Sequence, residues 1–210
     1  MNHPPGNSPA CLAPGQLKEQ EKRRVRQQEL RERYKDVLPE LCGGLLEIGC
    51  GHGHWLTAYA EQHPEQFCVG VDLINRRIQK STTKADKRAL HNIRFIKAEA
   101  IEWLEVVPDG IGIDRVMVLF PDPWPKKRHH RRRLIQAEFL ELLAGKMAPA
   151  GQLFFRTDHE PYFDWAREVI HEHPQWKLDS EFHWPLEQST YFQEIMGAHQ
   201  SLCATVVPLA

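Results

Sequence analysis

Four acidic residues of this 210-residue chain each lie in or just after a short apolar run. Glu47 lies in LLEIGCGHG, Asp72 ends VGVD, Glu99 follows IRFIK, and Asp122 follows VMVLF. Apolar runs of this length are typical of buried parallel strands. Because ligands of open α/β sheets bind at the carboxyl ends of the strands, the four acids predict a ligand site at that edge.

Three glycines, Gly49, Gly51 and Gly53, alternate directly after the first acid. Such a turn lets a ligand approach the backbone, although a tight strand-to-helix turn would also explain the glycines. A dinucleotide fingerprint has its third glycine one residue later, and Glu47 would repel a pyrophosphate. Asp72 follows the turn by about 20 residues, where a carboxylate can accept both hydroxyls of a ribose. Glu99 is expected near the edge of an adenine.

This arrangement resembles the class I S-adenosylmethionine-dependent methyltransferases, which have an acid-x-Gly-x-Gly-x-Gly turn and a ribose-binding acid. The matching residues are Glu47 to Gly53 and Asp72. The resemblance implies S-adenosylmethionine as the cofactor, with its ribose, adenine and cationic tail but no phosphate, and S-adenosylhomocysteine as the product. The cofactor-binding residues that it implies are Glu47, Gly49, Gly51, Gly53, Asp72, Glu99 and Asp122.

The most specific stretch of the chain is FPDPWPKKRHHRRR, residues 120–133. Three prolines in five residues end the strand and make the loop rigid, so that Asp122 is held at the carboxyl edge of the sheet. Six cations and no acid follow. Such a run is often only a solvated face, but its attachment to Asp122 favours a polyanion, most simply RNA. Trp124 either stacks on a base or packs on its own domain. The cations expected to contact RNA are Lys127, Arg128, Arg131, Arg132 and Arg133.

Residues 120–133 are nearly identical to the motif FPDPWPKKRHHKRR, and residues 30–197 resemble the bacterial tRNA (guanine-N7-)-methyltransferases. The resemblance implies methylation of a guanine in the variable loop of tRNA, position 46 in tRNA numbering. Asp122 would be the catalytic residue. Because guanine N7 has a lone pair and no proton, Asp122 would position the base and stabilise its developing positive charge. The implied substrate-binding residues are Lys126, Asp158, Thr190 and Gln193.

The chain departs from that family's pattern in a late segment, where Tyr191, Gln193 and Ile195 replace charged residues. One alternative is therefore a non-catalytic or altered-specificity RNA-binding relative with the methyltransferase fold. A second alternative is a nicotinamide oxidoreductase, which the glycine spacing and Glu47 disfavour.

Strands and helices must alternate to position these residues. Strands are expected at 44–48, 67–71, 93–97, 113–120 and 152–156. Helices are expected at 54–62, 74–90, 98–105, 132–147 and 161–171. The alternation predicts an α/β, Rossmann-like fold with a central, mostly parallel sheet and helices on both faces.

The two ends of the chain differ from this pattern. Residues 176–184 and 190–195 are expected to form a C-terminal antiparallel strand pair. The expected division of the chain is a disordered leader at 1–15, a basic N-terminal helix at 16–38 and a methyltransferase domain at 39–210.

Charge is distributed unevenly along the chain. The 27 Lys and Arg residues nearly balance the 28 Asp and Glu residues, yet residues 16–35 carry a net +4 and residues 126–133 carry +6. Nucleic-acid binding is therefore expected at two basic islands rather than over the whole surface.

The cysteine, histidine and apolar patterns bear on two further classes of function, metal binding and membrane insertion. Five cysteines form no CxxC pair, and the twelve histidines have no acid or cysteine set at ligand spacing, so no metal site is expected. No apolar run approaches the roughly 18 residues of a membrane span. These features favour a cytoplasmic protein with no membrane contact, and the resemblance implies tRNA as its partner. They leave a monomer and a homodimer equally open.

Overall fold

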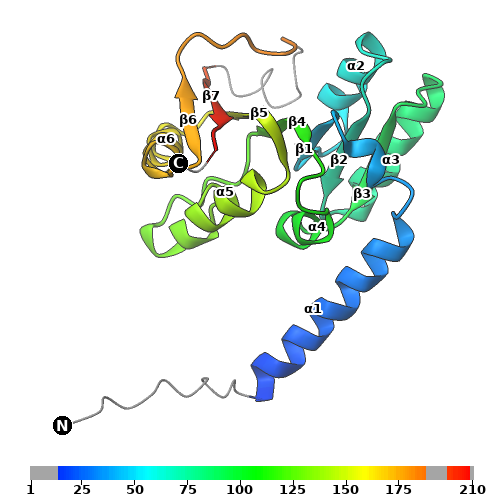
Figure 1. Cartoon of the computed structure of the whole chain (residues 1–210), viewed down its shortest axis with the longest axis horizontal. Coiled ribbons are helices and arrows are strands. Elements are labelled where there is room, and N and C mark those ends of the chain that lie inside the picture. The colour runs from blue at the N-terminus through cyan, green and yellow to red at the C-terminus, as the bar shows by residue number, and fades with distance from the viewer. Residues whose placement is uncertain (1–13, 188–197, 209–210) are drawn as a thin grey trace.

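A computed structural model of the chain describes residues 14–187 and 198–208 (Figure 1). Its centre is a seven-stranded sheet in the order β3-β2-β1-β4-β5-β7-β6. The first five strands are parallel, and β7 is antiparallel to both of its neighbours. The strands are β1 (Leu45–Ile48), β2 (Cys68–Asp72), β3 (Ile93–Lys97), β4 (Ile113–Leu119), β5 (Met147–Thr157), β6 (Trp176–Asp179) and β7 (Gln200–Val206).

Helices precede the first strand and connect the strands that follow. They are α1 (Pro14–Arg33), α2 (His54–Gln62), α3 (Asn75–Lys87), α4 (Ala100–Val106), α5 (Ala137–Ala144) and α6 (Glu160–Glu172), with 3-10 turns η1 (Pro39–Leu41) and η2 (Lys127–Arg132). From β1, the connections through α2 and α3 lead across the sheet to β2 and then to β3. The connections through α4 and α5 lead in the opposite direction, to β4 and then to β5. Right-handed crossovers therefore place α2 and α3 on one face of the sheet and α4 and α5 on the other. The predicted Rossmann-like α/β fold is confirmed.

Two apolar clusters hold these layers together. The larger one packs α4, α5 and α6 on the sheet and includes Trp103, Phe155 and Tyr162. The smaller one packs α2 on the sheet through Trp55 and Tyr59 of that helix. All four residues of β1 and all five of β2 are buried, because the central strands are covered on both faces.

Helix α1 extends away from the sheet and lies beside α4 along its C-terminal half (Figure 1). Arg23 pairs with Glu105 (Nη2 to Oε1, 2.7 Å) and Arg26 with Glu102 (2.5 Å). Tyr34 meets Trp103 edge to face, with the ring centroids 5.9 Å apart. Part of the first basic island is therefore neutralised by acids of α4.

The structure corrects the expected helix over 132–147, which begins later, at Ala137. The backbone at Arg133 and Gln136 is extended, and the preceding residues form the 3-10 turn η2. Strand β5 begins at Met147, so it occupies the end of the expected helix and is longer than predicted. Arg133 is buried by contacts to residues outside this segment, and such tertiary contacts override the helical propensity of the sequence here.

The expected C-terminal antiparallel pair exists, but its partners differ from the prediction. β6 pairs with β7, and β7 lies between β5 and β6. The expected second partner, 190–195, lies outside the described residues. The segment SLCATV shows no alternation because Leu202, Cys203 and Ala204 are all buried, as befits a strand covered on both faces. Among the described helices, none is long and apolar enough to cross a membrane.

Candidate active site

The sheet order brings the four predicted acids to one edge. Strands β3, β2, β1 and β4 are neighbours and parallel, so their carboxyl ends lie side by side. Glu47 lies in β1, Asp72 ends β2, Glu99 follows β3 and Asp122 follows β4. The topology thus assembles in space what the sequence distributes over more than seventy residues.

The glycine turn between β1 and α2 has a backbone that most residues avoid. Gly49, Gly51 and Gly53 all have positive φ, at 76°, 54° and 64°. A Cβ on Gly53 would lie 2.6 Å from atoms of Phe95 and Ser81, so this glycine allows close packing of the layers. A Cβ on Gly49 would meet nothing within 4 Å, so the turn is open on its outer side, where a ligand can approach the backbone.

Asp72 ties the glycine turn to the next loop. Its Oδ2 accepts a hydrogen bond from the Gly51 N–H (3.0 Å), and its Oδ1 accepts one from the Ile74 N–H (2.7 Å). Arg77 Nη1 lies 3.4 Å from Oδ2. A carboxylate has about four acceptor positions, so three donors leave room for one more hydrogen bond.

Glu47 is buried, with 3% of its surface exposed, and its Oε2 has no hydrogen-bond partner among the residues that the structure describes. Burial, and next the negative charge of Asp72, raise its pKa to about 8. A buried carboxyl group with an unpartnered oxygen is costly unless a ligand supplies the missing donor. The site therefore suits a ligand that brings a cationic or hydrogen-bond-donating group to Glu47.

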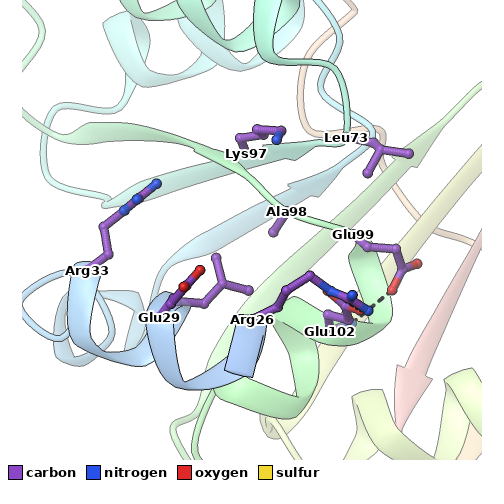
Figure 2. A pocket seen from close by; sticks show the side chains of 9 residues that line it. Arg26, Glu29, Arg33, Leu73, Lys97, Ala98, Glu99 and Glu102 are labelled. Atoms are coloured by element: carbon purple, nitrogen blue, oxygen red, sulfur yellow. Dashed lines mark hydrogen bonds and ion pairs between the residues drawn. The ribbon is translucent and has the colours of Figure 1, made fainter. Parts of the chain in front are cut away.

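Glu99 caps the first turn of α4. Its Oε2 accepts a hydrogen bond from the Glu102 N–H at 2.9 Å. A pocket of about 410 Å³ lies beside Glu99, between the ends of β2 and β3 and helix α1. Figure 2 shows the side chains that line this pocket. Leu73 presents an exposed apolar side chain to this pocket, and Arg26 and Arg33 line the opposite side. α1 is thus a wall of the pocket next to Asp72 and Glu99, which the sequence did not indicate.

The loop after β4 holds two residues in an uncommon conformation. Phe120 and Trp124 have φ values of 48° and 45° although neither is a glycine. Such strain persists only where the surroundings impose it, and it is concentrated at functional sites. Asp122 lies between them and is exposed. Trp124 packs on its own loop, against His129 (centroids 5.8 Å apart) and under the Arg132 guanidinium (4.9 Å).

The six cations of residues 126–133 differ in their exposure to solvent. Lys126, Lys127, Arg128, Arg131 and Arg132 are exposed along η2 and its start. Arg133, the sixth cation, is 3% exposed. Arg133 was predicted to contact RNA together with the other cations, but its guanidinium lies inside the protein in this structure.

Arg133 instead joins the β4 loop to the start of α6. Its Nε donates to the Pro123 carbonyl (2.9 Å) and its Nη1 to the Pro161 carbonyl (3.2 Å). The guanidinium also lies over the rings of Tyr162 (4.9 Å) and Trp165 (5.5 Å). Burial lowers its pKa. The two carbonyls and the ring faces offset part of the cost of holding a charge there, while its Nη2 has no hydrogen-bond partner among the described residues.

We expect Arg133→Ser to destabilise the protein by about 3 kcal/mol, because two hydrogen bonds from a charged donor are lost. For a domain of this size, that corresponds to a melting temperature roughly 8 °C lower. Thermal unfolding measures the effect. Arg131→Ser is the matched control, since Arg131 is exposed, and it should melt like the wild type. Equal melting of the two variants would contradict the structural role of Arg133.

The structure describes two of the four predicted substrate-binding residues. Asp158 follows β5 at the same edge of the sheet and is exposed, as is Lys126. Thr190 and Gln193 lie outside the described residues. No group of three potential metal-ligating side chains occurs in the described parts of the chain.

One residue near the site escaped the sequence analysis. Arg156 is buried in β5, and its carbonyl accepts from the Phe120 N–H at 2.8 Å. Its guanidinium contacts Glu187 with two bonds of 3.1 Å and lies 3.8 Å from the Trp184 ring centroid. An arginine in the apolar strand LFFRT is the signal that could have identified it, because buried arginines are rare and paired.

Comparisons with known proteins bear on this geometry. A methyltransferase family model, Methyltransf_4, matches residues 42–201. The chain is similar to proteins named tRNA (guanine-N(7)-)-methyltransferase: 35% identical to one from Caulobacter vibrioides (70% of this chain, 64% of the relative), and 40% to one from Leifsonia xyli (61% and 57%). A third, from Pseudomonas putida, is 37% identical (69% and 60%). The aligned part is less than two thirds of each relative's length.

Solved structures show the same fold at low identity. The 16S rRNA methyltransferase KamB has a TM-score of 0.59 with 18% identity, covering 82% of this chain and 92% of that one. The aminoglycoside resistance methyltransferase NpmB1 has a TM-score of 0.55 with 18% identity, covering 86% and 93%. Because the family model covers most of the chain, including the glycine turn and the β4 loop, the chain belongs to the Methyltransf_4 family of methyltransferases.

Proposed function

We propose that this protein transfers a methyl group from S-adenosylmethionine to N7 of a guanine in tRNA, at position 46 of the variable loop. The observation that carries the proposal is the intact loop of residues 120–133. It places an exposed carboxylate, Asp122, and five exposed cations at the sheet edge that also holds Glu47 and Asp72. The names of the relatives support the same substrate.

The residues at the edge fit the proposed cofactor. The unpartnered Oε2 of Glu47 would accept from an ammonium group, and the open backbone at Gly49 and Gly51 allows a close approach. Asp72 would bind the ribose, while Leu73 and Glu99 offer an apolar surface and a carboxylate for the adenine. When bound, S-adenosylmethionine supplies an electrophilic methyl group on a positively charged sulfur.

Asp122 has the role of positioning and charge stabilisation. Guanine N7 carries no proton, so no residue has to act as a base at that atom. The Asp122 carboxylate would accept hydrogen bonds from guanine N1 and N2 and favour the positive charge that develops on the ring. The exposed cations from Lys126 to Arg132, with Asp158 and the more distant Thr190 and Gln193, would hold the RNA next to it.

A direct test is to incubate the protein with an unmodified tRNA transcript and methyl-labelled donor, then to analyse the nucleosides by mass spectrometry. Labelled 7-methylguanosine is expected, and a transcript with adenosine in place of guanosine at position 46 should give none. A protein that binds the donor and the tRNA but forms no methylated nucleoside would favour the non-catalytic RNA-binding alternative.

Asp72→Ala is expected to weaken S-adenosylmethionine binding by about 1 to 3 kcal/mol, the range for hydrogen bonds to a charged group. Part of this loss reflects the glycine turn, since Asp72 accepts from the Gly51 N–H. Asp72→Asn keeps an acceptor of the same shape and should bind with intermediate affinity. Isothermal titration calorimetry measures both variants, and tighter binding of NAD than of S-adenosylmethionine by the wild type would favour an oxidoreductase.

A further inference from the structure

One face of α3 carries a concentration of positive charge that the sequence did not reveal, because its cations are spaced three or four residues apart. A shallow groove of about 620 Å³ on this helix is lined by Arg76, Lys80, Lys84, Lys87 and Arg88, and no acid lines it. This surface, the α3 basic face, is separate from α1 and from η2.

Contacts within the protein explain two of the five cations. Lys84 Nζ donates to the carbonyl of His52 in the glycine turn at 2.7 Å. Arg88 pairs with Glu61 of α2 at 2.7 Å. Arg76, Lys80 and Lys87 are exposed, and no ion pair joins them to any residue that the structure describes.

The positions of these cations do not help α3 to form. Arg76 and Lys80, and Lys80 and Lys84, are four residues apart, where like charges repel across a helix turn. Arg76 also lies in the first turn, where the helix dipole disfavours a cation, and that turn contains no acid. Lys84 and Lys87, in the last turn, are favoured by the dipole, whereas Arg76 and Lys80 are not. Local rules broken in this way, without a compensating contact, are typical of functional surfaces.

The position of α3 indicates what could bind there. The helix begins three residues after Asp72, at the carboxyl edge of the sheet. Because β1 lies between β2 and β4, the glycine turn after β1 separates α3 from the basic loop after β4. A polyanion that passes the site could therefore contact cations on both sides of the glycine turn.

We propose that the α3 basic face binds the phosphate backbone of the RNA substrate, as a second contact across the glycine turn from the basic loop. This inference rests on the proposed function, because it takes tRNA to be the substrate. Arg76, Lys80 and Lys87 make the phosphate contacts, while Lys84 holds the turn.

The test is the salt dependence of tRNA binding by the full chain. The variant Arg76→Gln, Lys80→Gln, Lys87→Gln removes three charges while keeping good helix formers. Each lost phosphate contact reduces the slope of log affinity against log salt by about 0.7 to 0.9, so we expect a slope flatter by about 2. The matched control, Arg94→Gln, Arg167→Gln, Lys177→Gln, removes three exposed cations on β3, α6 and β6 and should keep the wild-type slope.

Two further measurements separate binding from structure. The α3 variant should melt at the same temperature as the wild type or higher, because like-charge repulsion is relieved, and its S-adenosylmethionine affinity should be unchanged because Lys84 and Asp72 remain. A wild-type slope, or an equal flattening in the control, overturns the inference. If the wild type methylates tRNA while the α3 variant keeps its slope, only this inference fails. If the wild type neither binds nor methylates tRNA, the proposed function fails, and the inference fails with it.

Discussion

Glu47→Gln is expected to stabilise the free protein at pH 7.5 and, in the same variant, to weaken S-adenosylmethionine binding about tenfold to a hundredfold. The first effect arises because Glu47 is buried with an unpartnered oxygen, and its pKa of about 8 lies far above that of an exposed carboxyl group. The second arises because glutamine cannot offer a negative charge to the ammonium group of the ligand.

The sign of the pH dependence follows from the direction of this shift. A raised pKa in the folded state means that Glu47 holds its proton while the unfolded chain releases it. Its contribution to stability is therefore fully present below about pH 4.5 and is lost as the pH rises to about 8, at up to about 1.4 kcal/mol per pH unit. Glu47→Gln removes this loss, which at pH 7.5 is at most about 4 kcal/mol over three pH units, so we expect a gain of about 2 to 4 kcal/mol and a melting temperature roughly 5 to 10 °C higher.

The affinity for S-adenosylmethionine should have the opposite dependence on pH. Glu47 must be ionised to pair with an ammonium group, so wild-type affinity should rise between pH 6 and 8, by at most about tenfold per pH unit. Calorimetry at several pH values measures this rise, and Glu47→Gln should show none of it. A variant that melts lower than the wild type at pH 7.5 and keeps its pH-dependent affinity would contradict this role of Glu47.

Asp122→Asn is expected to lower the single-turnover rate of methylation about a hundredfold at saturating donor and tRNA, while tRNA affinity changes less than about threefold. The reason is that the carboxylate acts mainly on charge that develops during the transfer. The loop has a defined backbone conformation, with positive φ at Phe120 and Trp124, and asparagine at position 122 should preserve this conformation.

Rapid-quench measurements of the methylation rate and filter-binding measurements of tRNA affinity separate the two quantities. Asp114→Asn is the matched control, because Asp114 is an exposed carboxylate at the other end of β4 and should leave the rate unchanged. An unchanged rate in Asp122→Asn, or an equal loss of rate and affinity, would remove Asp122 from the transfer step.

Much of the fold and part of the candidate site followed from local patterns. The apolar runs before Glu47, Asp72 and Glu99 predicted three strands close to their observed bounds, because buried parallel strands are short and continuously apolar. Their acids then had to lie at one edge, since parallel strands place their carboxyl ends together. The predicted roles of the individual site residues stay predictions until the variants above are measured.

Other features depended on contacts that no local pattern encodes. Arg131 and Arg133 stand two residues apart in one run of cations, yet the first is exposed and the second is buried between the β4 loop and the start of α6. The difference arises because the β4 loop brings the Pro123 carbonyl to Arg133, and α6 brings the Pro161 carbonyl. The pairing of β7 with β5 and β6 was hidden for a similar reason, because a strand covered on both faces shows no alternation.

The amino-acid sequence by itself determined the strand-and-helix order, the acids at the strand ends and the rigid, basic loop, because each depends on residues close together in the chain. Only the tertiary structure decided which charges face solvent. It placed the cations of α1 against Glu102 and Glu105, buried Arg133, and left Arg76 and Lys80 exposed. The physical reason is that the free energy of a charge depends on its distance from partners and water, and that distance is set by the packing of segments far apart in the chain.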